Sequence, residues 1–220
     1  MLRASSAIGL LAALACIGLV PSAHADDPLS VSSVSVGSGE SPVTSGLSVA
    51  VDLKSQSGRF VQVMAQAEQA WVMAGRDWTF GRTSCSTYGM VGHFQAAPWV
   101  APFLRCERAL GTIAGQPVKA GAFAQPGVFL YREPLHWKND GTTNPERFNT
   151  GFFEQAFVNA GGLTVSLSHL NFLDEPVNWL PGAAFSTHVR SDIEVSASVL
   201  WNKNADRAMY FVGTTWHPHH

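Results

Sequence analysis

The side chains with the clearest catalytic potential are Ser168 and His169, which are adjacent in the chain. Polar residues that could orient an imidazole follow closely: Asn171, Asp174 and Glu175. A hydroxyl nucleophile, an imidazole base and a carboxylate are the parts of a hydrolase site. Neighbouring residues in an extended strand point to opposite faces, so Ser168 and His169 could act together only across a bulge. His169 is therefore the single catalytic candidate, and the sequence favours a role other than that of an enzyme.

Two groups of residues carry donor atoms for metal ions. The chain ends in a histidine-rich tail: His217, His219 and His220. A segment near the middle carries oxygen donors: Asn139, Asp140, Asn144 and Glu146. Histidines in a chain tail have no fixed geometry, and the oxygen donors match no calcium-binding spacing. We therefore predict no metal site and no cofactor.

The motifs of the commonest enzyme classes are absent. The chain contains no P-loop, G-x-G-x-x-G turn, G-x-S-x-G elbow, H-E-x-x-H helix or EF-hand loop. Its formal net charge is −2 and no stretch gathers basic residues, so we predict no nucleic-acid partner. Charged residues make up only 14% of the chain, whereas about a quarter is usual in soluble domains. Low charge is compatible with an apolar surface that faces lipid.

Residues 1–25 have the features of a cleavable secretory signal peptide. Arg3 supplies a positive charge, and residues 7–20 form an apolar core that is too short for a membrane span. The sequence Ala23-His24-Ala25 fits the small-x-small rule for cleavage. Cys16 offers an alternative as a lipoprotein site, which the apolar residues after it disfavour. We therefore expect an exported protein.

The exported part of the chain divides into two segments. Residues 26–45 are rich in Ser and Gly and are expected to form a flexible lead-in, with a short strand near residues 31–36 as an alternative. Residues 46–220 are expected to form a single β domain. This part of the chain contains two cysteines, Cys85 and Cys106. Because exported proteins fold in an oxidising compartment, we predict a disulfide bond between them.

From residue 46 onward the dominant pattern is an alternation of apolar and polar residues, which predicts β-strands with two different faces. Leu163, Val165 and Leu167 form the apolar face of one such segment. Turn residues separate about ten expected strands, at 46–54, 59–73, 78–90, 102–112, 117–131, 149–158, 163–172, 182–190, 193–201 and 207–216. Residues 59–74 also fit a helix, and we favour a strand because the neighbouring segments are strands.

Loop lengths favour an all-β fold, a small antiparallel up-and-down β-barrel with both termini on the periplasmic side. The expected outer loops are 55–58, 91–101, 132–148, 173–181 and 202–206. The expected periplasmic turns are 74–77, 113–116, 159–162 and 191–192. Long outer loops and short inner turns are typical of bacterial outer-membrane barrels. A soluble β-sandwich stays open as the alternative, because alternation does not tell whether the apolar faces meet lipid or a protein core.

In a barrel, the polar faces of the strands would line the lumen with Thr164, Ser166, Asp192, Glu194, Ser196 and Ser198. We expect a protein of a Gram-negative outer membrane, in contact with its lipid, with a structural, adhesive or narrow-channel role. An extracellular ligand would bind at loops 132–148 and 173–181. The alternatives are a secreted or periplasmic β-sandwich that binds a ligand, and a lipid hydrolase built on the barrel around His169. Substrate and oligomeric state do not follow from the sequence.

Overall fold

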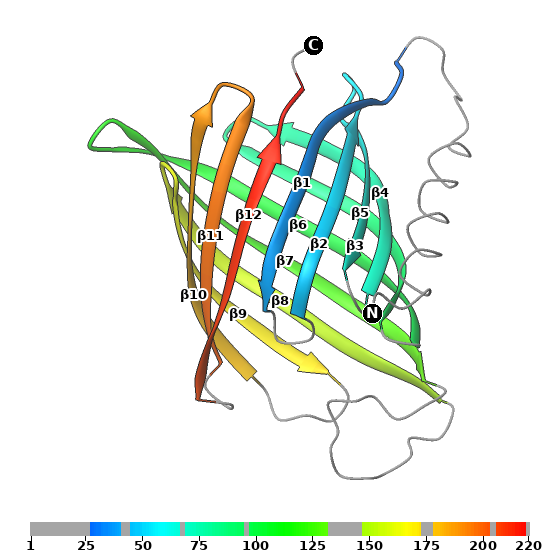
Figure 1. Ribbon diagram of the computed structural model, residues 1–220. Helices are drawn as coiled ribbons and strands as arrows, with labels where there is room; N and C mark the ends of the chain where they lie inside the picture. The colour runs from blue at the N-terminus through cyan, green and yellow to red at the C-terminus, as the bar shows by residue number, and fades with distance from the viewer. Residues whose placement is uncertain are drawn as a thin grey trace.

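The structure, a computed structural model, describes residues 27–40, 45–66, 69–94, 97–131, 147–172, 178–202 and 206–218. In chain order the strands are β1 (Ser30–Glu40), β2 (Ser45–Lys54), β3 (Arg59–Gln66), β4 (Gln69–Phe80), β5 (Thr83–Phe94), β6 (Ala97–Ile113), β7 (Gln116–Tyr131), β8 (Arg147–Ala160), β9 (Leu163–Phe172), β10 (Asn178–Arg190), β11 (Ile193–Asn202) and β12 (Arg207–Trp216). Each strand pairs antiparallel with its neighbours in the chain, and β1 pairs with β12 to close a barrel (Figure 1).

The described residues form twelve strands, not the predicted ten, for two reasons. The expected flexible lead-in, residues 26–45, contains β1, which pairs with both β2 and β12. The expected strand 59–73 is two strands, β3 and β4, so the predicted turn at 74–77 lies within β4. Residues 67–68 between them are Ala and Glu, neither of which is a typical turn residue. The helical alternative for residues 59–74 is also wrong, because β3 and β4 pair with each other.

β1 begins and β12 ends at the same end of the barrel, which we call the terminal end. Five short turns join strands there, at residues 55–58, 81–82, 114–115, 161–162 and 191–192. In one of them, Ala114 and Gly115 have positive φ angles of 50° and 78°. A two-residue hairpin turn whose twist matches the strands needs this left-handed backbone at both positions. The predicted outer loop at 55–58 was therefore placed at the wrong end.

The opposite end of the barrel, which we call the loop end, receives the longest connections of the chain. Residues 132–146 and 173–177 join strands at this end, as the loop pattern predicts, and lie outside the described residues. The expected loop 91–101 is much shorter, because β5 and β6 extend to residues 94 and 97. Its apolar composition, with Val91, Phe94 and Val100, suits strands better than a solvated loop.

The outward face of the barrel carries many large apolar side chains, and most of the polar side chains on the strands point into the barrel. On β9, the outward Leu163, Val165 and Leu167 are about half exposed, whereas the inward Ser168 is fully buried. Large exposed hydrophobic residues of this kind also lie on β5 to β8 and on β10 to β12. A soluble β-sandwich would bury this face between two sheets, so the sandwich alternative is wrong. No helix among the described residues is long and apolar enough to span a membrane.

Outward tryptophans lie at both ends of the barrel. Trp78 and Trp216 are near the terminal end, Trp179 and Trp201 are near the loop end, and all four are 43–48% exposed. Amphipathic indole rings at two levels are typical of the interfaces on either side of a membrane. Trp71 differs from these four, since it lies near the loop end and donates a hydrogen bond to Gln62 inside the barrel. The four outward rings define the height of the apolar belt.

The structure joins Cys85 and Cys106 in a disulfide bond between directly opposed residues of β5 and β6. Alternation along the strands puts both cysteines on the outward face. The bond closes a segment with a sequence separation of 21 residues. It therefore ties together the hairpin whose connection, residues 95–96, lies at the loop end.

The Cys85→Ala/Cys106→Ala variant is expected to lower the free energy of unfolding by about 2–3 kcal/mol, because the unfolded chain regains the freedom that a cross-link of this length removes. Urea unfolding of the refolded protein in detergent, followed by tryptophan fluorescence, measures this difference. Reduction of the unmodified protein is the matched control and should lower stability equally. Equal stability of the oxidised, reduced and double-variant proteins would contradict the prediction.

Candidate functional site in the barrel lumen

The inward faces of β6 to β11 enclose a cavity of about 460 Å³. Its polar lining consists of Arg105, Glu107, Lys119, Gln155, Asn159, Thr164, Ser166 and Ser198. Strand alternation places these side chains in the lumen, because the residues between them are the outward apolar ones. Amide, hydroxyl and charged groups in one cavity can replace the hydration of a polar solute. This cavity is the candidate functional site.

Three charged side chains dominate the cavity. The Glu107 carboxylate accepts a hydrogen bond from Lys119 at 2.9 Å and another from Arg105 at 3.3 Å. Arg105 also lies over the ring of Phe157, 4.8 Å from its centroid. Glu107 compensates one of the two cations, so this group carries a net charge of about +1. Both cationic side chains are nearly half exposed, so they can meet a solute in the lumen.

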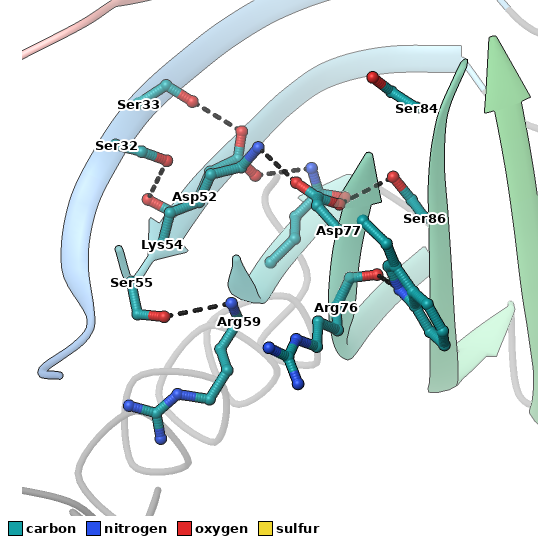
Figure 2. Close-up of polar contacts among 12 residues, drawn as sticks. Ser32, Ser33, Asp52, Lys54, Ser55, Arg59, Arg76, Asp77, Ser84 and Ser86 are labelled. Carbon is teal, nitrogen blue, oxygen red and sulfur yellow. Dashed lines mark hydrogen bonds and ion pairs between the residues drawn. The ribbon is translucent and has the colours of Figure 1, made fainter. Parts of the chain in front are cut away.

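A second polar group lies at the terminal end of the lumen, between β2, β4 and β5 (Figure 2). Lys54 donates a hydrogen bond to Asp77 at 2.9 Å, Ser86 donates one at 2.7 Å, and Tyr88 donates one at 3.0 Å. Both carboxylate oxygens of Asp77 therefore accept hydrogen bonds from neighbouring side chains. A carboxylate with three donors rigidifies its surroundings and is a poor ligand for a passing solute.

Asp52 has a similar environment on the neighbouring strands. It accepts hydrogen bonds from Ser33 at 2.6 Å and from Gln62 at 2.7 Å. Figure 2 shows both aspartates with their serine donors on adjacent strands. The two carboxylates thus link side chains of β1 to β5 by hydrogen bonds.

A row of aromatic rings crosses the inner wall from β3 to β8. Its members are Phe60, Tyr88, Phe103, Phe123 and Phe153, and successive ring centroids lie 5.0, 5.3, 5.2 and 5.0 Å apart. Distances of this size are favourable for aromatic pairs. This row was not predicted, because the polar faces of the strands were expected to line the lumen. The only signal was that each ring occupies an inward position of its strand.

Buried side chains occupy the lumen near the loop end on β9 to β12. Leu180 and Met209 are fully buried on inward positions of β10 and β12. The equally buried Ser168 is directly opposed to Leu180 and accepts a hydrogen bond from Gln155 at 2.9 Å. These side chains fill part of the lumen near the loop end.

Five of the six residues predicted to line the lumen lie on inward positions of β9 and β11, and the sixth, Asp192, lies in the turn before β11. Thr164, Ser166 and Ser198 line the cavity itself, and Thr164 accepts a hydrogen bond from Asn159 at 2.9 Å. Ser196 and Glu194 follow Ser198 on the same face of β11, and Asp192 is buried in the turn before it. They therefore fall in two places, the cavity and the terminal end.

His169 lies on the outward face, away from the cavity. Its ring stacks on Trp179, with centroids 4.7 Å apart, and its Nδ1 atom lies 3.5 Å from the Glu154 carboxylate. Ser168 points to the opposite face, into the barrel, as alternation along the strand predicts. The Ser168 hydroxyl and the His169 imidazole therefore do not come into contact. The described residues therefore assemble no Ser–His–carboxylate triad around His169, and Asp174 and Glu175 lie outside the described part of the chain.

Several other predicted positions also lie outside the described residues. They are the signal segment 1–25, the oxygen donors Asn139, Asp140, Asn144 and Glu146, the tail residues His219 and His220, and the greater part of loops 132–148 and 173–181. The edges of those loops belong to strands, because β8 begins at residue 147 and β10 begins at residue 178.

No protein-family model matches the chain significantly, and no curated protein sequence does. Solved structures do match. A structure described as "KdgM porin" is 11% identical, with a TM-score of 0.58, over 85% of this chain and 99% of the other. The structure described as "KdgM porin in complex with disordered oligogalacturonate" is 11% identical with a TM-score of 0.60 over the same shares.

A third match is described as "NanC porin structure in rhombohedral crystal form", with 9% identity and a TM-score of 0.61. It covers 86% of this chain and all of the other. At this level of identity the likeness concerns the fold. The chain therefore has the closed antiparallel barrel fold of outer-membrane porins, which agrees with its outward apolar belt and its two rings of tryptophans.

Proposed function

We propose that this protein is a narrow outer-membrane channel for small polar solutes, exported by means of residues 1–25. The observation that carries the proposal is the 460 Å³ polar cavity inside a barrel whose outer face is apolar. Barrels of about 8 strands are filled by side chains, whereas barrels of about 16 hold an aqueous channel. A twelve-stranded barrel lies between these limits, and its cavity is consistent with a narrow passage. The terminal end faces the periplasm and the loop end faces outward.

The charges of the cavity favour solutes with a single negative charge. Arg105 and Lys119 outnumber Glu107, and the remaining polar lining is neutral. A net positive charge inside a low-dielectric wall concentrates anions. One structural neighbour is described in complex with oligogalacturonate, a carboxylate-bearing sugar chain, which agrees with this charge preference.

The aromatic row favours solutes with apolar as well as polar faces. Phe103, Phe123 and Phe153 lie on the strands that also carry Arg105, Lys119 and Gln155. Sites that combine aromatic surface with a few placed polar groups suit organic ligands better than bare inorganic ions. Small sugar acids combine these properties and are the substrate class that we propose.

Reconstitution of the protein in planar lipid bilayers tests the channel. We expect discrete conductance steps, and reversal potentials in a salt gradient that change with the charge of the cavity. In the variant Arg105→Gln/Lys119→Gln the charge of the group changes from +1 to −1, so the ratio of anion to cation permeability should fall by about twofold or more. If the unmodified protein gives no conductance steps, the channel proposal is wrong.

The matched control is Arg108→Gln, which removes a cation from the same strand. Arg108 is exposed and alternates with Glu107, so its side chain points outward. Its loss should leave the permeability ratio unchanged. A control that shifts selectivity as strongly as the Arg105 and Lys119 change would show that the cavity does not determine selectivity.

Two further expectations remain proposals. Ligand binding at loops 132–148 and 173–181 would add recognition outside the membrane to the channel. Contact with outer-membrane lipid follows from the apolar belt if the barrel is inserted. The hydrolase alternative has no support from the described residues, since Ser168 and His169 face opposite sides of the barrel wall.

A further inference from the structure

Three side chains with metal-binding atoms converge at the terminal end of the barrel. They are His188 on β10, Glu194 on β11 and His217, which directly follows β12. The Glu194 carboxylate lies 3.8 Å from Nε2 of His188 and 4.0 Å from Nε2 of His217. One donor atom from each of the three residues lies within 4.8 Å of the other two. This group was not predicted, because His188, Glu194 and His217 are far apart in the chain and His217 resembled part of the histidine tail.

The backbone holds the three residues in this arrangement. His188 and Glu194 are directly opposed in the β10–β11 ladder, just before the bulge that separates His188 from Arg190. His217 is fixed by the pairing of Trp216 with Ile193 and by a hydrogen bond from its backbone N–H to the Asp192 carbonyl at 2.8 Å. Three separate segments therefore deliver the donor atoms, and none depends on a long loop.

The side-chain contacts leave the donor atoms available. The Nε2 atom of His217 is buried and has no hydrogen-bond partner within the described part of the chain. The imidazole rings of His188 and His217 lie side by side, with centroids 5.8 Å apart. The nearby cation, Arg190, is directed to Asp192 at 3.1 Å instead of to Glu194. Two imidazole rings therefore lie next to the Glu194 carboxylate.

We propose that His188, Glu194 and His217 bind a divalent transition-metal ion of the Zn²⁺ type. Two imidazole nitrogens and one carboxylate oxygen form a donor set that binds such ions in preference to Ca²⁺ or Mg²⁺, which favour oxygen ligands alone. Tetrahedral coordination with bonds near 2.1 Å places donor atoms about 3.4 Å apart. The three donor atoms lie within 4.8 Å of one another, so they need to approach by at most about 1.4 Å. The ring of His188 is more than half exposed, which leaves room for this movement and for a water molecule as fourth ligand.

The bound ion would join the β10–β11 turn to the end of β12. These segments form the rim of the lumen at the terminal end, because Glu194 shares its face with Ser196 and with Ser198 of the cavity. A cation at this rim would also reverse the negative charge that Glu194 contributes. The ion would therefore act as a structural clip and as a fixed charge at the inner mouth.

The test uses the full exported chain, refolded in detergent without an affinity tag and titrated with ZnCl₂ or CoCl₂. Isothermal titration with Zn²⁺ should give one equivalent per chain, and Co²⁺ should give the intense visible absorption of a tetrahedral site. His188→Ala, Glu194→Gln and His217→Ala should each weaken binding about tenfold or more. The heat-dependent mobility shift of barrels on gels verifies that every variant is folded.

Two controls remove histidines elsewhere. His93→Ala removes an exposed histidine of β5, and His219→Ala/His220→Ala removes the end of the tail. Both should bind Zn²⁺ as the unmodified protein does. Loss of binding in the tail variant, with unchanged binding in His188→Ala and Glu194→Gln, would overturn the proposal and assign the ion to the tail. No saturable binding by the unmodified protein would overturn it as well.

Discussion

The Leu167→Arg variant is expected to lose about 2–4 kcal/mol of stability in a membrane, because this is the cost of a cation on the lipid face of a barrel near the bilayer centre. Leu167 lies in the middle of β9 and points outward, with 46% of its surface exposed. Chemical unfolding of the protein inserted in lipid vesicles, followed by tryptophan fluorescence, measures the loss.

The neighbouring Ser166→Arg variant is the matched control. It introduces the same side chain one position earlier, where it points into the cavity beside Thr164 and Ser198. The arginine can be solvated there, so we expect a folded barrel with reduced conductance. Equal destabilisation by both substitutions would contradict the assignment of inward and outward faces.

The Phe103→Ala variant is expected to enlarge the passage and to cost about 2–3 kcal/mol, somewhat less than a fully buried phenylalanine. Phe103 lies at the centre of the aromatic row, between Tyr88 at 5.3 Å and Phe123 at 5.2 Å. Its removal breaks both contacts and opens space on the inner wall. Single-channel recording should show a higher conductance, and urea unfolding should show the loss of stability.

Phe152→Ala provides the comparison, since Phe152 points outward from β8 and is 43% exposed. This variant removes a phenyl ring from the lipid face instead of the inner wall, and it should leave conductance unchanged. Increased conductance in this variant, or unchanged conductance in Phe103→Ala, would show that the aromatic row does not border the passage.

Alternation along the strands made most of the barrel predictable. The bounds of β9 and β12 agree with the predicted segments 163–172 and 207–216, which turn residues delimit on at least one side. β1 was not counted among the ten strands, because its Ser and Gly residues resemble a linker, although a short strand near residues 31–36 was an alternative. Pairing with β2 and β12 extends this segment to residues 30–40 and makes it a wall strand of the barrel. Local composition carries no information about such a distant partner.

The candidate site was predictable only in part. The polar inward positions Thr164, Ser166 and Ser198 follow from alternation alone. The ion pairs of Glu107 and the contacts of the aromatic row depend on the stagger between strands, which a single sequence does not reveal. The approach of His217 to His188 likewise requires that β12 close against β11.

The pairing of β1 with β12 has a consequence for assembly. All other pairings in the barrel join strands that are neighbours in the chain, so those hairpins can form early and locally. The final seam joins residues as distant as Ser35 and Thr215, whose side chains are hydrogen-bonded at 3.0 Å across 180 positions. Until β12 pairs with β1, the sheet has two unpaired edges and an uncovered apolar face, and both favour aggregation in water. We therefore expect the unclosed sheet to need a chaperone until its last strand pairs.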